Sequence, residues 1–342
     1  MNILITGGAG FVGSNLARAF RARGDAVTTF DNLYRRGSEL NVPLFRELGI
    51  GFHRGDVRNP ADLEALDGTF DVFIEASAEP SVHAGLSGSP DYLLGTNLTG
   101  TLHALEFARR RAGVFVFLST SRVYSIAPLV QLPLTETATR FTGPAIDESF
   151  PTNTHRSLYG ASKLASELII QEYVATYGLK AVIDRCGVIA GPGQFGKVDQ
   201  GVFTYWMAAH HFGLPLKYTG FGGTGKQVRD LLHPADLFAL IEKQIQQPDG
   251  ETYNVGGGIE GSVSLCELTA LCREITGNTV AVASDPTTSP VDVPYYVTNN
   301  AKVSAAYDWS PQRRPRDIMN DIATWIRDNE ELLRPIFVEA TR

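Results

Sequence analysis

The chain has 342 residues, of which 43% are hydrophobic and 20% are charged, and its formal net charge is −7. This composition is typical of a globular protein with a large core, and the negative charge argues against a broad nucleic-acid or membrane-binding surface. No apolar run approaches the roughly 20 residues that a membrane helix needs, and the three cysteines lack zinc-ligand spacing. We therefore expect a cytoplasmic protein without a signal peptide, a metal site, or a membrane or nucleic-acid partner.

Strand-like and helix-like segments alternate through the first half of the chain. Short, β-rich apolar runs are separated by longer segments with helical patterning. The expected strands are Asn2–Thr6, Ala26–Asp31, Gly51–His53, Asp71–Ala76, Val114–Ser119 and Lys180–Arg185. The expected helices are Val12–Arg23, Pro90–Arg111 and Leu158–Tyr177. This alternation predicts an α/β fold with a doubly wound parallel sheet of the Rossmann type.

The regular alternation ends after Arg185, where glycine and proline become frequent. We expect residues 186–228 and 258–342 to form a smaller C-terminal substrate-binding domain, with a helix over Val202–Phe212. Residues 1–185 and 229–257 are expected to form the larger domain. In that division the segment Leu231–Val255 returns to the main sheet.

A glycine-rich turn follows the first strand. Gly7, Gly10 and Gly13 have the spacing Gly-x-x-Gly-x-x-Gly, and a helix begins near Phe11 and Val12. Bare backbone here lets a pyrophosphate approach the free N–H groups of the helix start, where the helix dipole favours an anion. The alternative is a tight turn without a ligand. The flanking strand and helix favour dinucleotide binding by the larger domain.

Asp31 ends the second strand about 20 residues beyond the turn, where a carboxylate accepts hydrogen bonds from ribose hydroxyls. A carboxylate at this point repels a 2′-phosphate, which favours NAD over NADP, although Arg35 and Arg36 lie close enough in sequence to neutralise a phosphate. Asp56 and Val57 follow the short third strand, where the edge of an adenine fits. The alternative role for Asp56 is that of a capping residue in a turn.

Tyr159 and Lys163 are four residues apart, so on the expected helix they share one face. A tyrosine with its ordinary pKa of about 10 is a poor base at neutral pH. A nearby ammonium favours the phenolate and predicts a lowered pKa, which makes the phenol a useful general base. Thr120, at the end of the strand Val114–Ser119, is placed to hydrogen-bond the reacting group. The alternative is an exposed lysine beside a half-buried tyrosine.

Taken together, these motifs resemble an extended short-chain dehydrogenase/reductase. The similarity covers residues 1 to about 325 in order and includes Thr6–Gly13, Asp31, Asp56-Val57, Asn97, Thr120, Tyr159-x-x-x-Lys163 and Gln227-Val-Arg-Asp230. Within that superfamily the chain resembles the nucleotide-sugar epimerases, in particular the CDP-paratose (CDP-tyvelose) 2-epimerase group. The features similar to that group include Gly55-Asp-Val-Arg-Asn59, Thr135-Glu-Thr-Ala-Thr-Arg140, Asp199-Gln-Gly201 and Asp308-Trp-Ser-Pro311.

The resemblance implies a role for each matched position. Tyr159 is the expected base, Lys163 tunes it, and Thr120 shares the hydrogen bond to the substrate. The expected NAD-binding residues are Gly7, Gly10, Phe11, Val12, Asp31, Asn32, Asp56, Val57, Ala76, Ser77, Ala78, Asn97, Ser119, Tyr159 and Lys163. Arg229 is expected to hold the substrate diphosphate, because a guanidinium matches phosphate oxygens. Gln200 and Gly201 are expected to approach the sugar or the phosphates.

Three departures from the family pattern bear on the reaction. The stretch Thr120-Ser-Arg-Val-Tyr124 lacks the Asp-Glu pair that 4,6-dehydratases of the superfamily carry after the equivalent threonine. Water elimination therefore has no evident catalyst. An arginine that relatives carry shortly before Asp292 is absent, and Ser289 and Pro290 stand there. Gly187-Val-Ile189 replaces the asparagine or serine that is common after the strand.

We therefore expect an NAD-dependent nucleotide-sugar epimerase that acts by transient oxidation to a keto sugar, with carbon 2 of a CDP-hexose as the inverted centre. The alternatives are a UDP-sugar 4-epimerase and an NAD(P)-dependent nucleotide-sugar reductase or dehydrogenase. By analogy with relatives, the helices around residues 96–108 and 158–177 are expected to pack into the four-helix bundle of a homodimer.

Overall fold

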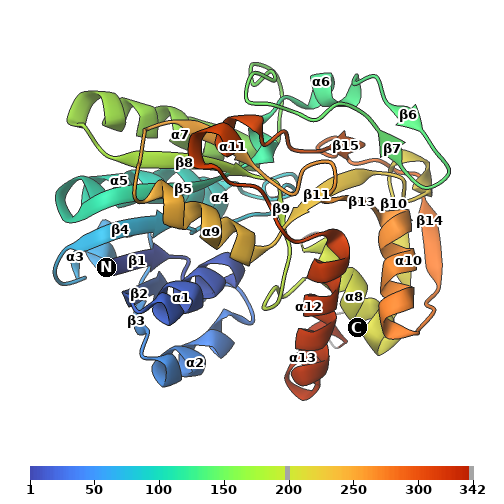
Figure 1. The fold of residues 1–342 in the computed structure, drawn as a ribbon, viewed down its shortest axis with the longest axis horizontal. Helices are drawn as coiled ribbons and strands as arrows, with labels where there is room; N and C mark the ends of the chain where they lie inside the picture. The colour runs from blue at the N-terminus through green and yellow to red at the C-terminus, as the bar shows by residue number, and fades with distance from the viewer. Residues whose placement is uncertain (197–200, 339–342) are drawn as a thin grey trace.

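The computed structural model describes residues 1–196 and 201–338, and its centre is a seven-stranded parallel sheet (Figure 1). The strand order is β12-β8-β5-β4-β1-β2-β3. The strands are β1 Asn2–Thr6, β2 Ala26–Asp31, β3 Gly51–Arg54, β4 Phe70–Glu75, β5 Ala112–Thr120, β8 Ala181–Cys186 and β12 Thr252–Val255. The order changes direction between β1 and β4, which is the point of a doubly wound sheet where ligands bind. The predicted sheet class is confirmed.

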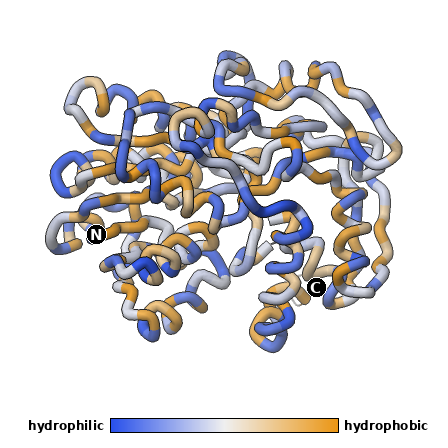
Figure 2. Tube along the Cα trace, viewed as in Figure 1, coloured by the Kyte–Doolittle hydropathy of each residue, from blue (hydrophilic) through white to orange (hydrophobic). Residues whose placement is uncertain are grey.

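Helices cover both faces of this sheet, because successive strand residues point to opposite sides. On β1, Ile3 and Ile5 belong to one hydrophobic core and Leu4 belongs to the other. The first core is covered by α1 Phe11–Arg23, α2 Asn41–Leu48, α9 Pro234–Gln244 and α11 Ala301–Tyr307. The second is covered by α3 Pro60–Glu64, α5 Gly100–Arg111 and α7 Leu158–Tyr177. Hydrophobic positions accordingly gather along the strands, with hydrophilic ones in loops (Figure 2).

The long helix predicted over Pro90–Arg111 is three helical pieces in sequence. They are α4 Asp91–Leu94, a π-helical turn over Gly95–Thr99, and α5 Gly100–Arg111. A π turn adds a residue to the helical repeat and so changes which side chains face inward. It leaves Asn97 fully buried beside α7. The prediction of α7 is confirmed at both ends, where Ser157 caps the first turn and Gly178 has a left-handed φ of 66°.

The right half of Figure 1 has its own core of four helices. These are α8 Val202–Phe212, α10 Leu265–Thr276, α12 Pro315–Asp328 and α13 Glu330–Phe337. Short strands lie beside them: β9 Val188–Ile189, β10 Leu216–Thr219, β11 Val228–Leu232, β13 Ser262–Ser264, β14 Val282–Asp285 and β15 Tyr295–Tyr296. The division of the chain at residues 185/186, 228/229 and 257/258 stays a prediction.

The segment Leu231–Val255 returns to the main sheet only in part. Its last four residues form β12, which pairs with β8. Leu231 and Leu232 instead end β11, which pairs with β9, β13 and β15 in a separate sheet. Two smaller elements complete the upper right of Figure 1: α6 Ile126–Val130 and the hairpin of β6 Thr135–Glu136 with β7 Phe141–Thr142. Among residues 1–196 and 201–338, no helix combines the length and apolar character needed to cross a bilayer.

Candidate active site

Two adjoining cavities open at the carboxyl ends of the central strands. The first has a volume of about 440 Å³, and the second has a volume of about 800 Å³. Gly7, Gly10, Ala76 and Ala78 line both, so the two cavities form one continuous cleft along the switch point of the sheet. A cleft of this extent has room for a dinucleotide and for a second ligand beside it.

The glycine turn after β1 fits close to the neighbouring strand and to α1. Gly7 has a left-handed φ of 62°, and a Cβ on it would lie 2.6 Å from the carbonyl oxygen of Ala76. A Cβ on Gly13 would overlap the carbonyl oxygen of Gly7. Glycine is therefore required at both positions. The turn brings the start of α1, with Phe11 and Val12, to the wall of the second cavity as a site for a phosphate.

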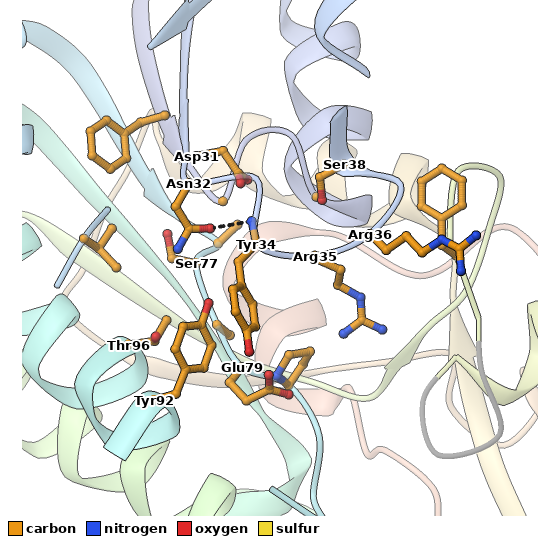
Figure 3. A pocket seen from close by; sticks show the side chains of 18 of the residues that line it. Asp31, Asn32, Tyr34, Arg35, Arg36, Ser38, Ser77, Glu79, Tyr92 and Thr96 are labelled. Carbon is orange, nitrogen blue, oxygen red and sulfur yellow. Dashed lines mark hydrogen bonds between the residues drawn. The ribbon is translucent and has the colours of Figure 1, made fainter. Parts of the chain in front are cut away.

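The carboxylate of Asp31 is fixed where the ribose was expected. Its Oδ2 accepts from the backbone N–H of Ala9 at 3.1 Å, and its Oδ1 accepts from Leu33 at 2.8 Å. Burial raises the pKa of Asp31, and the backbone hydrogen bonds oppose this effect. Asp31, Asn32, Ser77 and Ala78 all line the first cavity (Figure 3). The placement predicted for these four residues is therefore found.

Asp56 lies behind the cavity wall, whereas Val57 lines it. The Asp56 carboxylate accepts from Asn32 at 3.0 Å and from the backbone N–H of Arg58 at 2.9 Å. Burial acts to raise the pKa of Asp56, but the hydrogen bonds from Arg58 and Asn32 lower it to about 2. Its contacts are those of the turn-capping residue that was the alternative. Its role in binding adenine stays a prediction.

A stacked pair of tyrosines, which we call the aromatic clasp, lines the first cavity, and the sequence motifs gave no sign of it. The rings of Tyr34 and Tyr92 stack with centroids 4.2 Å apart, and the Arg58 guanidinium lies 4.6 Å from the Tyr92 centroid. Figure 3 shows both rings at the cavity, one from the loop after β2 and one from α4. The clasp connects two segments that are far apart in the sequence.

Thr120, Tyr159 and Lys163 meet at the second cavity, as predicted. A Cβ on Gly160 would overlap the carbonyl oxygen of Arg122, so only glycine lets α7 begin so close to the end of β5. This packing allows the Thr120 hydroxyl to hydrogen-bond the Tyr159 phenol.

The predicted lowering of the Tyr159 pKa is wrong for the protein side chains alone. The phenol is almost completely buried, and burial raises its pKa to about 12, against the smaller opposing effects of Thr120 and Arg122. Removal from water disfavours the charged form of a tyrosine, and here this cost outweighs the neighbouring charges. A further positive charge at the phenol is needed to make it a base at neutral pH.

Lys163 is held in place by a ring and an acid. Its Nζ lies 4.2 Å from the centroid of Phe117, a cation–π distance. Burial lowers the Lys163 pKa, and the charge of Glu75 opposes this. Glu75 ends β4, is fully buried, and accepts from the Thr101 hydroxyl at 3.2 Å. The sequence reasoning missed Glu75, although a glutamate that ends the apolar run Phe70–Ile74 was a usable signal.

Asn97 is buried next to the cleft and lines neither cavity, and its role as an NAD-binding residue stays a prediction. Its amide donates to the Glu79 carbonyl at 3.0 Å and to the Ser162 hydroxyl at 3.3 Å, and its carbonyl accepts from the Glu79 N–H at 2.8 Å. Asn97 thereby ties the loop after β4 to α7. Ser119, by contrast, lines the second cavity, although its hydroxyl also donates to Glu167.

The far wall of the second cavity holds the expected phosphate ligand. The guanidinium of Arg229 donates to Asp292 Oδ1 at 2.9 Å and to the Val293 carbonyl at 2.6 Å. Burial lowers its pKa to about 10, against the opposing charge of Asp292. Gly201 lines the same cavity, whereas Gln200 lies outside the described residues.

The chain matches a known protein family. The model of the NAD dependent epimerase/dehydratase family matches residues 3–256. The chain belongs to this family. It is 32% identical to the CDP-paratose 2-epimerase of Salmonella typhi, over 95% of this chain and 99% of that protein. It is 28% identical to the dTDP-glucose 4,6-dehydratase of Streptomyces niveus, over 98% of this chain and 96% of that protein.

A solved structure of the family has the same fold. The UDP-glucose 4-epimerase of Thermus thermophilus, in complex with NAD, superimposes with a TM-score of 0.80 at 28% identity. The alignment covers 96% of this chain and 99% of that one. The resemblance drawn from the motifs is therefore confirmed at the level of the family.

As a member of the NAD-dependent epimerase/dehydratase family, the protein is an enzyme that uses NAD, and its cleft fits that cofactor. The glycine turn would present backbone N–H groups to a pyrophosphate, Asp31 would face the ribose, and Val57 would form part of the adenine wall. The first cavity leads from there to Ala76, Ala78 and then Tyr159. The nicotinamide end of the cofactor would thus reach the reactive phenol.

Proposed function

We propose that the protein is a nucleotide-sugar epimerase that inverts carbon 2 of a CDP-hexose by transient oxidation. The observation that carries the proposal is the meeting of Thr120, Tyr159 and Lys163 in the second cavity. The 32% identity to a CDP-paratose 2-epimerase supports the choice of nucleotide and carbon.

The protein side chains would move a proton in both directions. Tyr159 removes the proton of the sugar hydroxyl, and Thr120 holds the same oxygen by a hydrogen bond. Lys163, on the same face of α7, stabilises the phenolate and binds the adjacent ribose. NAD, held by the glycine turn, Asp31 and Lys163, would supply the acceptor and donor of the hydride and the positive charge that the buried phenol lacks. Tyr159 then returns the proton to the alkoxide of the inverted sugar.

Inversion requires the keto sugar to turn while its nucleotide stays bound. The second cavity, at about 800 Å³, is large enough for a nucleotide sugar that changes its orientation. Arg229 lines this cavity as an anchor for the diphosphate, and Trp206, Leu216 and Lys217 line it as well. A cavity that holds the diphosphate at Arg229 and leaves room around the sugar would allow the keto sugar to turn while its nucleotide stays bound.

The residues present argue against the dehydratase activity of other family members. Ser121 and Arg122 follow Thr120, and neither supplies the carboxyl group that water elimination requires. A UDP-sugar 4-epimerase is the second candidate, and the likeness to the Thermus thermophilus enzyme favours it. Both candidates share the same chemistry at Tyr159 and differ in the sugar carbon presented to it.

Incubation of the enzyme with CDP-hexoses and UDP-hexoses, without added NADH, tests the proposal. The expected result is inversion of one centre, followed by NMR, without accumulation of NADH. A CDP-sugar should react in preference to a UDP-sugar. Stoichiometric NADH together with a stable keto product would instead establish a dehydrogenase.

We further propose that the enzyme is a homodimer that pairs α5 and α7. The outer face of α7 exposes 57% of Leu168 and 56% of Tyr177, which is unusual for large apolar side chains. Light scattering should give the mass of two chains for the wild type and of one for Leu168→Glu. A monomeric wild type at micromolar concentration would refute the pairing.

A further inference from the structure

Arg122 is a cation in the second cavity to which the family resemblance gives no role. It lies in the 3₁₀ turn Ser121–Val123 directly after Thr120, and its side chain is 25% exposed. Its guanidinium donates to the Val291 carbonyl at 3.3 Å and lies 3.7 Å from Asp292 Oδ1. The side chain therefore links the end of β5 to the loop before β15.

The start of this side chain is fixed beside the reactive phenol. The N–H of Arg122 donates to Thr120 Oγ1 at 3.2 Å, and its carbonyl packs against Gly160, the residue after Tyr159. The positive charge of Arg122 acts to lower the pKa of Tyr159, against the larger effect of burial. The guanidinium is therefore close enough to the phenol for the two groups to interact electrostatically.

Arg122 and Arg229 share one carboxylate. Asp292 Oδ1 accepts from Arg229 at 2.9 Å and lies 3.7 Å from Arg122. Asp292 thus pairs with both guanidinium groups, while Asp230, whose own pKa burial raises, adds a smaller attraction for Arg229. Such a pair of guanidinium groups fits an anion with several oxygens, because each guanidinium presents several N–H donors.

We propose that Arg122 and Arg229 together bind the diphosphate of the substrate, with Arg122 on the phosphate that carries the sugar. The inference rests on the proposed function, in which the ligand is a nucleoside-diphosphate sugar. Arg122 thus supplies a second cation near Asp292, where Ser289 and Pro290 replace the arginine of relatives.

This placement bears on which carbon reacts. The sugar phosphate is bonded to carbon 1 of the sugar, and carbon 2 is its direct neighbour, whereas carbon 4 lies across the ring. The backbone of Arg122 adjoins Thr120 and Gly160, and its guanidinium charge acts on the Tyr159 phenol, so a phosphate bound by Arg122 would lie on the side of the cavity where the proton is removed. A phosphate held by Arg122 near Tyr159 favours reaction at carbon 2 of the sugar over reaction at carbon 4.

Binding of nucleotides that carry no hexose directly tests whether Arg122 and Arg229 bind the diphosphate. Calorimetry compares CDP with CMP, and UDP with UMP, for the wild type, Arg122→Met and Arg122→Lys, all loaded with NAD. We expect Arg122→Met to weaken nucleoside-diphosphate binding about tenfold, since a charged hydrogen bond is lost, and to leave monophosphate binding nearly unchanged. Arg122→Lys should retain part of the affinity for the diphosphate, because lysine keeps the positive charge but lacks the planar set of N–H donors of a guanidinium.

Arg316→Met is the matched control, because Arg316 is exposed, pairs with a single carboxylate and lines neither cavity. Equal affinity of Arg122→Met and the wild type for CDP and UDP would overturn the inference, and so would an equal loss for the monophosphates. If the wild type binds CDP with help from Arg122 but inverts no sugar, the proposed function is wrong, whereas diphosphate binding by Arg122 and Arg229 is supported. If the wild type binds neither diphosphate, both fail.

Discussion

The phenol of Tyr159 and the ammonium of Lys163 lie in a part of the cleft where burial disfavours the charged form of each. Burial raises the pKa of Tyr159 to about 12 and lowers that of Lys163. The charge of Glu75 counteracts the effect on Lys163, although burial also raises the Glu75 pKa to about 7. The acid is therefore ionised mainly above neutral pH, where the lysine is most in need of a counter-charge.

Replacement of Glu75 by Gln should shift the basic limb of the pH–kcat profile to lower pH. The amide removes the charge that favours protonated Lys163, so the ammonium loses its proton earlier as pH rises. The shift is measured with saturating NAD and substrate. Glu64→Gln, at an exposed carboxylate on α3, is the control and should leave the profile in place. A basic limb that Glu75→Gln does not move would show that Glu75 has no influence on Lys163.

The site could be predicted from sequence where one short motif fixes both residue and position. The glycine turn, Asp31 and Tyr159-x-x-x-Lys163 are of this kind, because each belongs to a single turn, strand end or helix. Arg122, Glu75 and the Tyr34–Tyr92 pair were missed as site residues, since their roles depend on contacts between distant segments. The Tyr159 pKa was mispredicted because the amino-acid sequence does not show how deeply the phenol is buried in the fold.

At the scale of elements, the clasp of Tyr34 and Tyr92 joins the loop after β2 to α4 over the first cavity. An epimerase that acts by transient oxidation must keep its cofactor through the whole catalytic cycle, because a keto sugar cannot be reduced again once NADH has dissociated. The clasp lies where it would slow the departure of the adenosine end. Its stacking and the Arg58 contact are each contributions of about 1 kcal/mol.

We therefore expect Tyr92→Ala to release NAD about tenfold faster than the wild type, which corresponds to a loss of about 1.4 kcal/mol. Tyr92→Phe is the matched variant, since it keeps the ring and loses only the hydroxyl, and it should stay close to the wild type. Stopped-flow exchange of bound NAD against a fluorescent analogue gives both rates. Equal release rates for the alanine variant and the wild type would exclude a retaining role for the clasp.

Regular elements were predicted well, and irregular ones were not. Strands β1 and β2 and helices α7 and α8 have the predicted bounds, because each is an uninterrupted run closed by a clear signal such as Gly178. The π turn at Gly95–Thr99 has no comparable signal, and the helix was predicted as continuous. Leu231 and Leu232, which end β11, were placed in a segment expected to return to the main sheet, because the partners of β11 (β9, β13 and β15) come from three separate segments.

At the scale of the whole molecule, buried acids make the stability of the fold depend on pH. Asp184 on β8 is fully buried, and burial raises its pKa to about 7, although a hydrogen bond from Gln244 at 2.7 Å opposes this. Below pH 4 the acid is protonated in both the folded and unfolded states. Between about pH 4 and pH 7 the unfolded chain loses this proton first, so the free energy of unfolding falls as pH rises.

Asp184→Asn should remove this dependence and keep the acceptor for Gln244. We expect the variant to be more stable than the wild type by roughly 1–3 kcal/mol at pH 8 and to differ little from it at pH 4. Urea unfolding at a series of pH values measures the difference. A variant that is less stable than the wild type at pH 8 would show that the Asp184 carboxylate is favourable in the folded state.

The account as a whole depends on the Tyr159 phenol as the group that takes and returns the sugar proton. The most direct measurement is the turnover of Tyr159→Phe on the accepted nucleotide sugar, together with its content of bound NAD. We predict a loss of kcat of about 10³-fold with NAD content unchanged, while Tyr177→Phe, at an exposed position on the same helix, keeps full activity. A Tyr159→Phe variant that still inverts the sugar at a rate close to the wild type would contradict the account.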